Sequence, residues 1–257
     1  MSETKNFYWK NRLRASGIHL CISLAIASLA ALLVFLVWYP YPYGEISGGR
    51  ELFFILVSVD VVLGPLITLT IFNPTKPRSE LVRDLTIVGL IQLAALGYGL
   101  WTVFVARPVH LVYEFDRFRV VHAVDVPPEL LDQAPPELRS LPLFGQTAMA
   151  VRPFKDPQER YEATMAALQG VQLGFRPDLW EPYTDARMRV LLAATPAARL
   201  KERFPDKAEL IDEAIAQTGK QEASLVSLPM VGRDSYWTVL LDSSTADVVG
   251  FIPLDSF

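Results

Sequence analysis

Three long apolar runs in the first 105 residues constrain this chain more than any other feature. They cover residues 18–39, 52–72 and 85–105. Each run is long enough for a helix to cross a hydrocarbon core of about 30 Å, and a helix satisfies its own backbone hydrogen bonds in lipid. The sequence therefore predicts a membrane protein with a three-helix transmembrane domain in residues 1–105 and a separate domain in residues 106–257.

Basic residues beside these runs set their orientation. Seven of them flank the ends that we expect to be cytoplasmic: Lys5, Lys10, Arg12, Arg14, Lys76, Arg78 and Arg83. In the loop between the first and second runs, Arg50 is the one basic residue. Because Lys and Arg concentrate on the cytoplasmic side of a membrane, we expect a cytoplasmic N-terminus and an exported position for everything after Val105.

The first run has a second interpretation, as a secretory signal peptide, which also begins basic and then becomes apolar. The run is longer than the apolar part of a signal peptide, and it ends in WYPYPY instead of small residues. The bulky residues His19 and Leu20 precede Cys21, where a lipoprotein signal needs small ones. We therefore interpret the run as an uncleaved helix.

The two parts of the chain differ in charge. Residues 1–105 contain eight Lys/Arg and six Asp/Glu, whereas residues 106–257 contain sixteen and twenty-two. The mildly acidic balance of the exported part argues against a surface that binds nucleic acid or anionic lipid through charge. This part has no cysteine, and a domain of about 150 residues buries enough apolar surface to fold without disulfides.

The pattern after residue 105 predicts an α+β domain. β-branched and aromatic residues favour strands, and they predict strands at 109–115, 118–124, 146–152, 224–230, 236–242 and 247–253. Helical patterns cover 156–169, 185–194 and 196–217, the last interrupted near Pro205. The segment DSSTAD predicts a turn before the last strand. We expect an antiparallel sheet with helices on one face.

Asp60 is the most unusual residue, because it places a carboxylate near the middle of the second apolar run. An ionisable group there is costly unless it is protonated, paired or hydrated, and it is therefore a candidate functional residue. The alternative interpretation is a hydrogen-bonded Asp that holds the helices together. His19 and Gln92 are its candidate polar partners, and the depth of Gln92 in the third run favours Gln92.

Gly64 and Pro65 follow Asp60 one helical turn later. Proline has no N–H, so it frees a carbonyl one turn earlier, close to Asp60. The candidate intramembrane partner site consists of Asp60, Gln92, His19, Gly64 and Pro65, with helix packing as the alternative. Aromatic residues predict interfacial belts at both ends of the first run: Phe7, Tyr8 and Trp9, then Trp38, Tyr39, Tyr41 and Tyr43.

The sequence lacks the motifs of the common enzyme classes. His110 and His122 fall on two predicted strands without the spacing of a metal site. No GxSxG, Walker or dinucleotide-binding pattern occurs. An isolated histidine on a strand is most often a packed or a surface residue, so we expect no catalytic residue, no metal site and no cofactor.

Several strings, taken in order, resemble the TfpX/TfpZ family of type IV pilin accessory proteins. They are HLCISL, WYPYPY, DVVLGPLITLTIF, QLAALGYG and RPVHLVYEFDRFRVVHA, and they span about residues 12–125. The resemblance implies a Gram-negative inner-membrane protein with a periplasmic C-terminal domain. It also implies a non-enzymatic, chaperone-like role in the stability, export or assembly of a type IV pilin. The resemblance is weak after residue 126, where we expect the choice of pilin to be made.

Two other functions remain open on the residues alone. One is a membrane-anchored periplasmic sensor or ligand-binding subunit, and the other is a membrane enzyme or proton-coupled protein that uses Asp60. The short inner segments leave little room for a sensor's output module, and three helices are few for a transporter unless it oligomerises. The pilin accessory role is therefore the leading hypothesis.

Overall fold

A computed structural model describes residues 2–257, and the side chains of residues 7–51 and 53–257. The chain divides into two compact units. The first consists of residues 1–40 and 49–105, and the second of residues 41–48 and 106–257.

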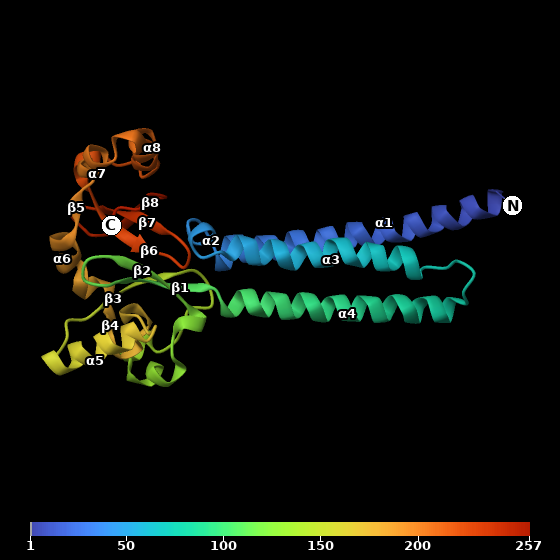
Figure 1. The fold of residues 1–257 in the computed structure, drawn as a ribbon, viewed down its shortest axis with the longest axis horizontal. Helices are drawn as coiled ribbons and strands as arrows, with labels where there is room; N and C mark the ends of the chain where they lie inside the picture. The colour runs from blue at the N-terminus through green and yellow to red at the C-terminus, as the bar shows by residue number, and fades with distance from the viewer. Residues whose placement is uncertain (1) are drawn as a thin grey trace. The chain divides into compact units, whose positions relative to one another are not determined.

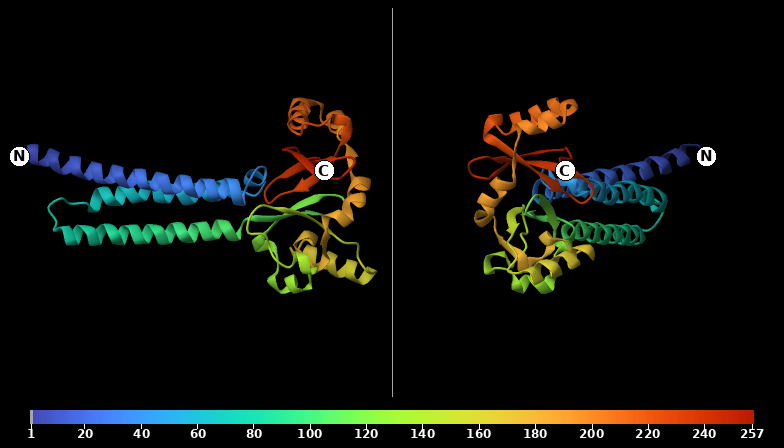
Figure 2. Two further views of the ribbon diagram at one scale, coloured as in Figure 1. Left: turned by 180° about the vertical axis from the view of Figure 1, so that it is seen from behind. Right: turned by 60° about the vertical axis from the view of Figure 1, so that its left-hand side comes forward.

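Three long helices make up the first unit. Helix α1 (Ser2–Leu33) continues through a π-helical turn (Val34–Trp38), and it is followed by α3 (Gly49–Ile71) and α4 (Arg78–Val105). In each view of Figures 1 and 2, α3 runs between α1 and α4. All three are long and apolar enough to cross a membrane, which confirms the three apolar helices predicted from the sequence.

Buried side chains of the first unit gather around Tyr39, which is 1% exposed. Its hydroxyl donates to the main-chain carbonyl of Val103 at 3.0 Å. This carbonyl belongs to the last turn of α4, where helical acceptors lack partners within the helix. A Cβ at Gly49 would lie 2.4 Å from the Tyr39 ring, so glycine allows α3 to begin there. Tyr39 is therefore buried inside the bundle, beside the last turn of α4.

The second unit is built on a sheet of eight strands. They are β1 (Pro108–Tyr113), β2 (Phe118–His122), β3 (Thr147–Val151), β4 (Trp180–Pro182), β5 (Thr195–Pro196), β6 (Leu225–Val231), β7 (Tyr236–Asp242) and β8 (Val248–Ile252). Their order is β4-β3-β1-β2-β6-β7-β8, and β5 pairs with β6. The predicted α+β class is confirmed.

The sheet is mixed, whereas the sequence analysis predicted an antiparallel one. β1 pairs with β3 and β2 with β6 in parallel. The neighbours β1–β2, β6–β7 and β7–β8 are antiparallel, as expected for strands joined by short turns. Both parallel pairs join strands that are far apart in the sequence. The local residue pattern therefore does not predict their pairing.

Helices cover both faces of the sheet, so the expectation of one covered face is wrong. The helices are α5 (Pro157–Leu168), α6 (Tyr183–Ala193), α7 (Ala198–Arg203) and α8 (Ala208–Gln217). On one face α6 packs near Leu111 and Val239. On the other, α5 packs near Val112, and α7 and α8 pack near Leu240. Because successive residues are buried throughout β1, and in β7 from Trp237 onward, both faces need a cover.

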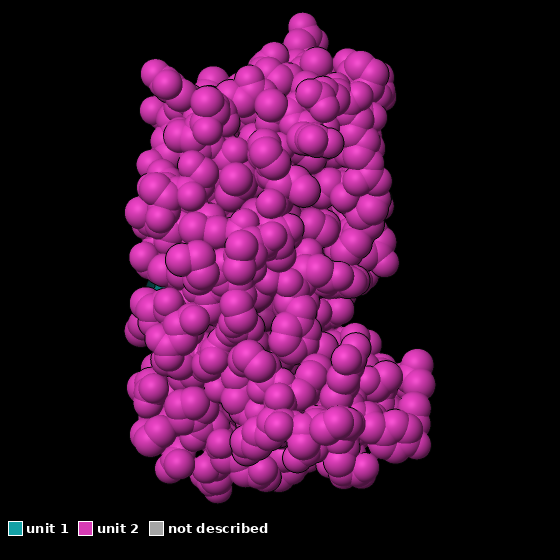
Figure 3. All heavy atoms as spheres, turned by 90° about the vertical axis from the view of Figure 1, so that its left-hand side faces the viewer, with its two compact units in different colours: residues 1–40, 49–105 teal, residues 41–48, 106–257 magenta. Residues whose placement is uncertain are grey.

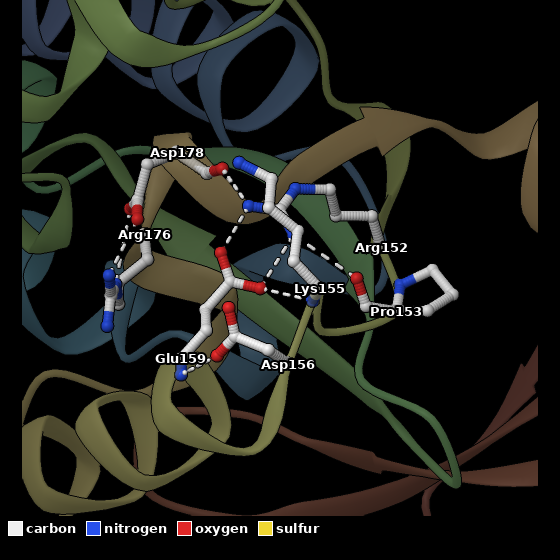
Figure 4. A network of polar contacts seen from close by, with 7 residues as sticks. All are labelled: Arg152, Pro153, Lys155, Asp156, Glu159, Arg176 and Asp178. Atoms are coloured by element: carbon white, nitrogen blue, oxygen red, sulfur yellow. Dashed lines mark hydrogen bonds and ion pairs between the residues drawn. The ribbon is translucent and has the colours of Figure 1, made fainter.

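An ion-pair network fixes the start of α5 (Figure 4). Asp156 caps the helix by accepting from the Glu159 main-chain N–H at 2.8 Å. Arg152 donates two hydrogen bonds to the Glu159 carboxylate, at 2.7 and 2.9 Å. Together with the main-chain N–H of Lys155, this guanidinium lowers the pKa of Glu159 to about 2. The network joins the helix to β3, which ends at Val151.

Residues 41–48 belong to the second unit, although they connect α1 to α3. Figure 3 shows one face of this unit in magenta. They contain the short helix α2 (Tyr43–Ile46). Ile46 is fully buried and its carbonyl accepts from the Arg233 main-chain N–H at 3.2 Å. A Cβ at Gly232 would lie 2.1 Å from Ile46, so only glycine allows this approach.

This packing has two consequences. Tyr43 is 8% exposed and packs edge-on against Phe251 in the core of the second unit. The loop between α1 and α3 is also part of the same folded body as residues 106–257. Both therefore lie on one side of any membrane that the three helices cross.

Candidate intramembrane site

A cavity of about 200 Å³ lies at mid-length among the three long helices. α1 contributes His19 to its lining, α3 contributes Asp60, and α4 contributes Gln92. Most of the remaining lining is aliphatic. The structure thus brings three of the residues singled out in the sequence to one place, from three separate helices.

Gly64 is the point where α1 and α4 both approach α3. A Cβ at this position would lie 2.1 Å from the Gln92 side-chain nitrogen and 3.1 Å from Nε2 of His19. The absence of a side chain at Gly64 therefore lets both polar groups reach α3. Pro65, the fifth predicted site residue, lies inside α3, and its carbonyl accepts from the Ser16 hydroxyl at 2.9 Å.

The carboxylate of Asp60 has no hydrogen bond to any described residue. Gln92 donates instead to the main-chain carbonyl of Asp60, at the long distance of 3.5 Å. His19 is the titratable side chain that interacts electrostatically with Asp60, but its Nδ1 is 2.5 Å from the Thr68 hydroxyl. The half-buried carboxylate is therefore left with unused acceptor capacity at the wall of the cavity.

The cavity opens to the outside of the bundle. Ile22 on α1 and Leu93 on α4 both line it, and they are 54% and 59% exposed. Two apolar side chains at the edge of a cavity with a polar wall can accommodate an apolar segment that carries one hydrogen-bond donor or cation.

Comparisons with known proteins identify relatives along nearly the whole chain. It is 37% identical to the fimbrial assembly protein, serogroup I, of Dichelobacter nodosus over 250 residues, which are 95% of each chain. It is 35% identical to the serogroup E1 protein of the same organism, again over 95% of each chain. A third relative, of serogroups C1 and C2, is 43% identical over 48% of this chain and 91% of its own.

The chain belongs to the fimbrial assembly protein family. The family model described as fimbrial assembly protein FimB matches residues 7–48. In this family member the matched segment contains His19 and Ser16 of the site, and the loop that packs into the second unit. No solved structure matches the chain.

The sequence analysis did not foresee the polar contacts that join α1 to α3 in this fimbrial assembly protein. Thr68 holds His19, Ser16 binds the Pro65 carbonyl, and Arg12 donates to the Phe72 carbonyl at 2.8 Å. Their spacing was the available signal. Residues 60, 64 and 68 share one face of α3, and residues 12, 16, 19 and 23 share one face of α1.

The two histidines of the second unit are packed in its interior, the first of the two ordinary positions expected from the sequence. His110 and His122 are 2% and 1% exposed. Nδ1 of His110 lies 2.6 Å from the Thr147 hydroxyl, and Nδ1 of His122 lies 3.0 Å from Asp125. Among the described residues, no group of three or more His, Cys, Asp or Glu is arranged to hold a metal ion.

Proposed function

We propose that this protein is a non-enzymatic, chaperone-like accessory protein that assists the stability, export or assembly of a type IV pilin. The observation that carries the proposal is similarity over 95% of the chain to proteins named fimbrial assembly proteins. The resemblance of residues 12–125 to the TfpX/TfpZ proteins supports a type IV pilin as the partner.

The cavity among the helices is the proposed contact point in the membrane. A partner helix lying against α1 and α4 would cover Ile22 and Leu93, whose exposed fractions exceed one half. A donor or cation on that helix would satisfy the Asp60 carboxylate, which is costly to leave without a partner in lipid. His19, Gly64, Pro65 and Gln92 then act as positioning residues for Asp60.

In this proposal the N-terminus is cytoplasmic, and the second unit is periplasmic in a Gram-negative inner membrane. The bias of basic residues supports that orientation. One scaffold then contacts both the membrane helix and the exported head of a pilin. Two modest contacts linked in this way reinforce each other through their effective concentration.

The test is to delete the protein from its native host and to measure surface pili and pilin together. The proposal expects fewer or altered pili, restored by the wild-type chain, and pilin that copurifies with the chain from detergent-solubilised membranes. Unchanged pili together with no pilin in the purified material would contradict it.

A chimera tests where the specificity lies. Residues 126–257 are exchanged for those of a relative that serves a different pilin, and residues 1–125 are exchanged in the reciprocal control. We expect pilus assembly to follow residues 126–257. If it follows residues 1–125, the helices choose the pilin.

A further inference from the structure

The loop between the short 3-10 helix Pro136–Leu138 and β3 has an exposed apolar tip. Leu143 and Phe144 are adjacent there, and they are 57% and 71% exposed. Gly145 follows with φ +66°, a left-handed conformation that turns the chain back towards β3. Two consecutive large apolar side chains directed away from the core need a cover that residues 106–257 do not supply.

Both ends of this tip are tied to the residues that follow α4. The guanidinium of Arg107 donates to the Pro142 carbonyl at 2.8 and 3.3 Å. On the other side of the tip, the Gln146 side chain donates to the Pro108 carbonyl at 3.3 Å. Arg107 is 5% exposed, so its side chain is part of the folded interior. We call these two ties, Arg107 to Pro142 and Gln146 to Pro108, the staple.

The length of α4 indicates where the chain leaves the membrane, two residues before Arg107. The apolar part of α4, residues 85–105, rises about 31 Å, which matches a hydrocarbon core of about 30 Å. Trp101 and Phe104 lie in its last turns, with ring centroids 6.1 Å apart, as expected where a helix meets the interface. Arg107 is two residues beyond Val105, a reach of at most about 7 Å. The loop is therefore tied to the residues at which the chain leaves the third apolar helix.

We propose that Leu143 and Phe144 insert into the boundary between headgroups and acyl chains, in the leaflet on the side of residues 106–257. The partner is the bilayer surface, because the staple ties the loop to the residues that directly follow α4, whatever protein is bound. The exposed side chains of Met188 and Leu192 on α6 are apolar as well, but no hydrogen bond among the described residues ties α6 to the residues that directly follow α4. This anchor is independent of any pilin contact.

The test uses the full chain in phosphatidylethanolamine/phosphatidylglycerol vesicles. Cys21, the single cysteine, is changed to Ser, and Phe144→Cys carries a nitroxide spin label. Met188→Cys is the matched control, since Met188 is 69% exposed and Phe144 is 71%. Collision with oxygen reports apolar surroundings, and collision with a water-soluble nickel chelate reports water.

We expect the ratio of oxygen to nickel collisions to be at least about threefold higher at position 144 than at position 188. Leu143→Cys should behave like Phe144→Cys. Equal ratios at 144 and 188 would overturn the proposal. Shielding from both reagents that disappears on dilution into excess lipid would also overturn it, in favour of contact with a second copy of the chain.

Discussion

The side-chain amide of Gln92 on α4 lies against Gly64 on α3, 2.1 Å from where a Cβ at position 64 would be. Gly64→Leu is therefore expected to push α3 and α4 apart and to lower the stability of the bundle by about 1–3 kcal/mol. Gly89→Leu is the matched control, because a Cβ at Gly89 meets no described atom within 4 Å. Thermal unfolding of the full chain in detergent compares the two, and equal melting temperatures would contradict this packing. Adding Gln92→Ala to Gly64→Leu should recover part of the loss.

Two substitutions at Asp60 separate its hydrogen-bonding capacity from its shape. Asp60→Asn keeps an acceptor and a similar volume, so it should retain most pilus assembly. Asp60→Leu removes the polar group and should impair assembly more strongly, while the amount of inserted protein stays close to that of the wild type. Pilus yield and membrane-fraction immunoblots measure the two effects. Full pilus assembly by both variants would remove Asp60 from the proposed site.

The proposed orientation is tested by reporters fused after Pro74 and after Pro108. A reporter active only in the cytoplasm should work after Pro74, and one active only in the periplasm should work after Pro108. The expectation rests on seven basic residues beside the inner ends against Arg50 in the outer loop. A cytoplasmic signal after Pro108 would refute the orientation.

His110 should make the second unit less stable in mild acid. Burial, together with the positive charge of Arg107, lowers the pKa of His110 to about 4. A group with a lowered folded-state pKa contributes stability above its unfolded pKa of about 6.5, and this contribution is lost as the pH falls towards 4. The loss between pH 7.5 and pH 5 is about 2 kcal/mol.

The measurement is the melting temperature of the full chain in detergent at those two pH values. His110→Gln should show a smaller decrease than the wild type. Glu159 does not interfere, because its contribution to stability is present above its unfolded-state pKa of about 4.3 and is lost only as the pH falls from there towards its folded-state pKa of about 2. The same decrease in both proteins would show that another group titrates.

The local residue pattern predicted most of the helices and strands correctly. The second unit's strands β1, β2, β3, β6, β7 and β8 and its helices α5 to α8 overlap the segments indicated by residue type and period, and β1, β6 and α6 extend one or two residues beyond them. The short strands β4 and β5 were not predicted. The break predicted near Pro205 separates α7 from α8. What the pattern missed is non-local. The parallel pairing of β2 with β6 joins residues more than one hundred positions apart, such as Phe118 and Met230.

The sequence indicated only part of the candidate intramembrane site, because only some of its residues differ from their neighbours in type. Asp60 and Gln92 stand out because each interrupts an apolar run, and Gly64 and Pro65 because they are unusual inside a helix. Serine and threonine are common in membrane helices. Only the spacing of Ser16 and Thr68 relative to the other polar residues indicated that they belong to the site. Tyr39 and Tyr43 match an interfacial belt by composition, and their burial depends on Val103 and Phe251, which lie far along the chain.

The central claim is that the open cavity beside Asp60 contacts a pilin helix, and in-membrane photocrosslinking tests it most directly. A photoreactive residue replaces Leu93 at the cavity edge, and the control replaces Ile91, which is 65% exposed and lies on the other side of α4. We predict a crosslink to pilin from position 93 that exceeds the one from position 91 and weakens in the Asp60→Leu chain. Equal yields from both positions, or no pilin crosslink from either, would contradict the account.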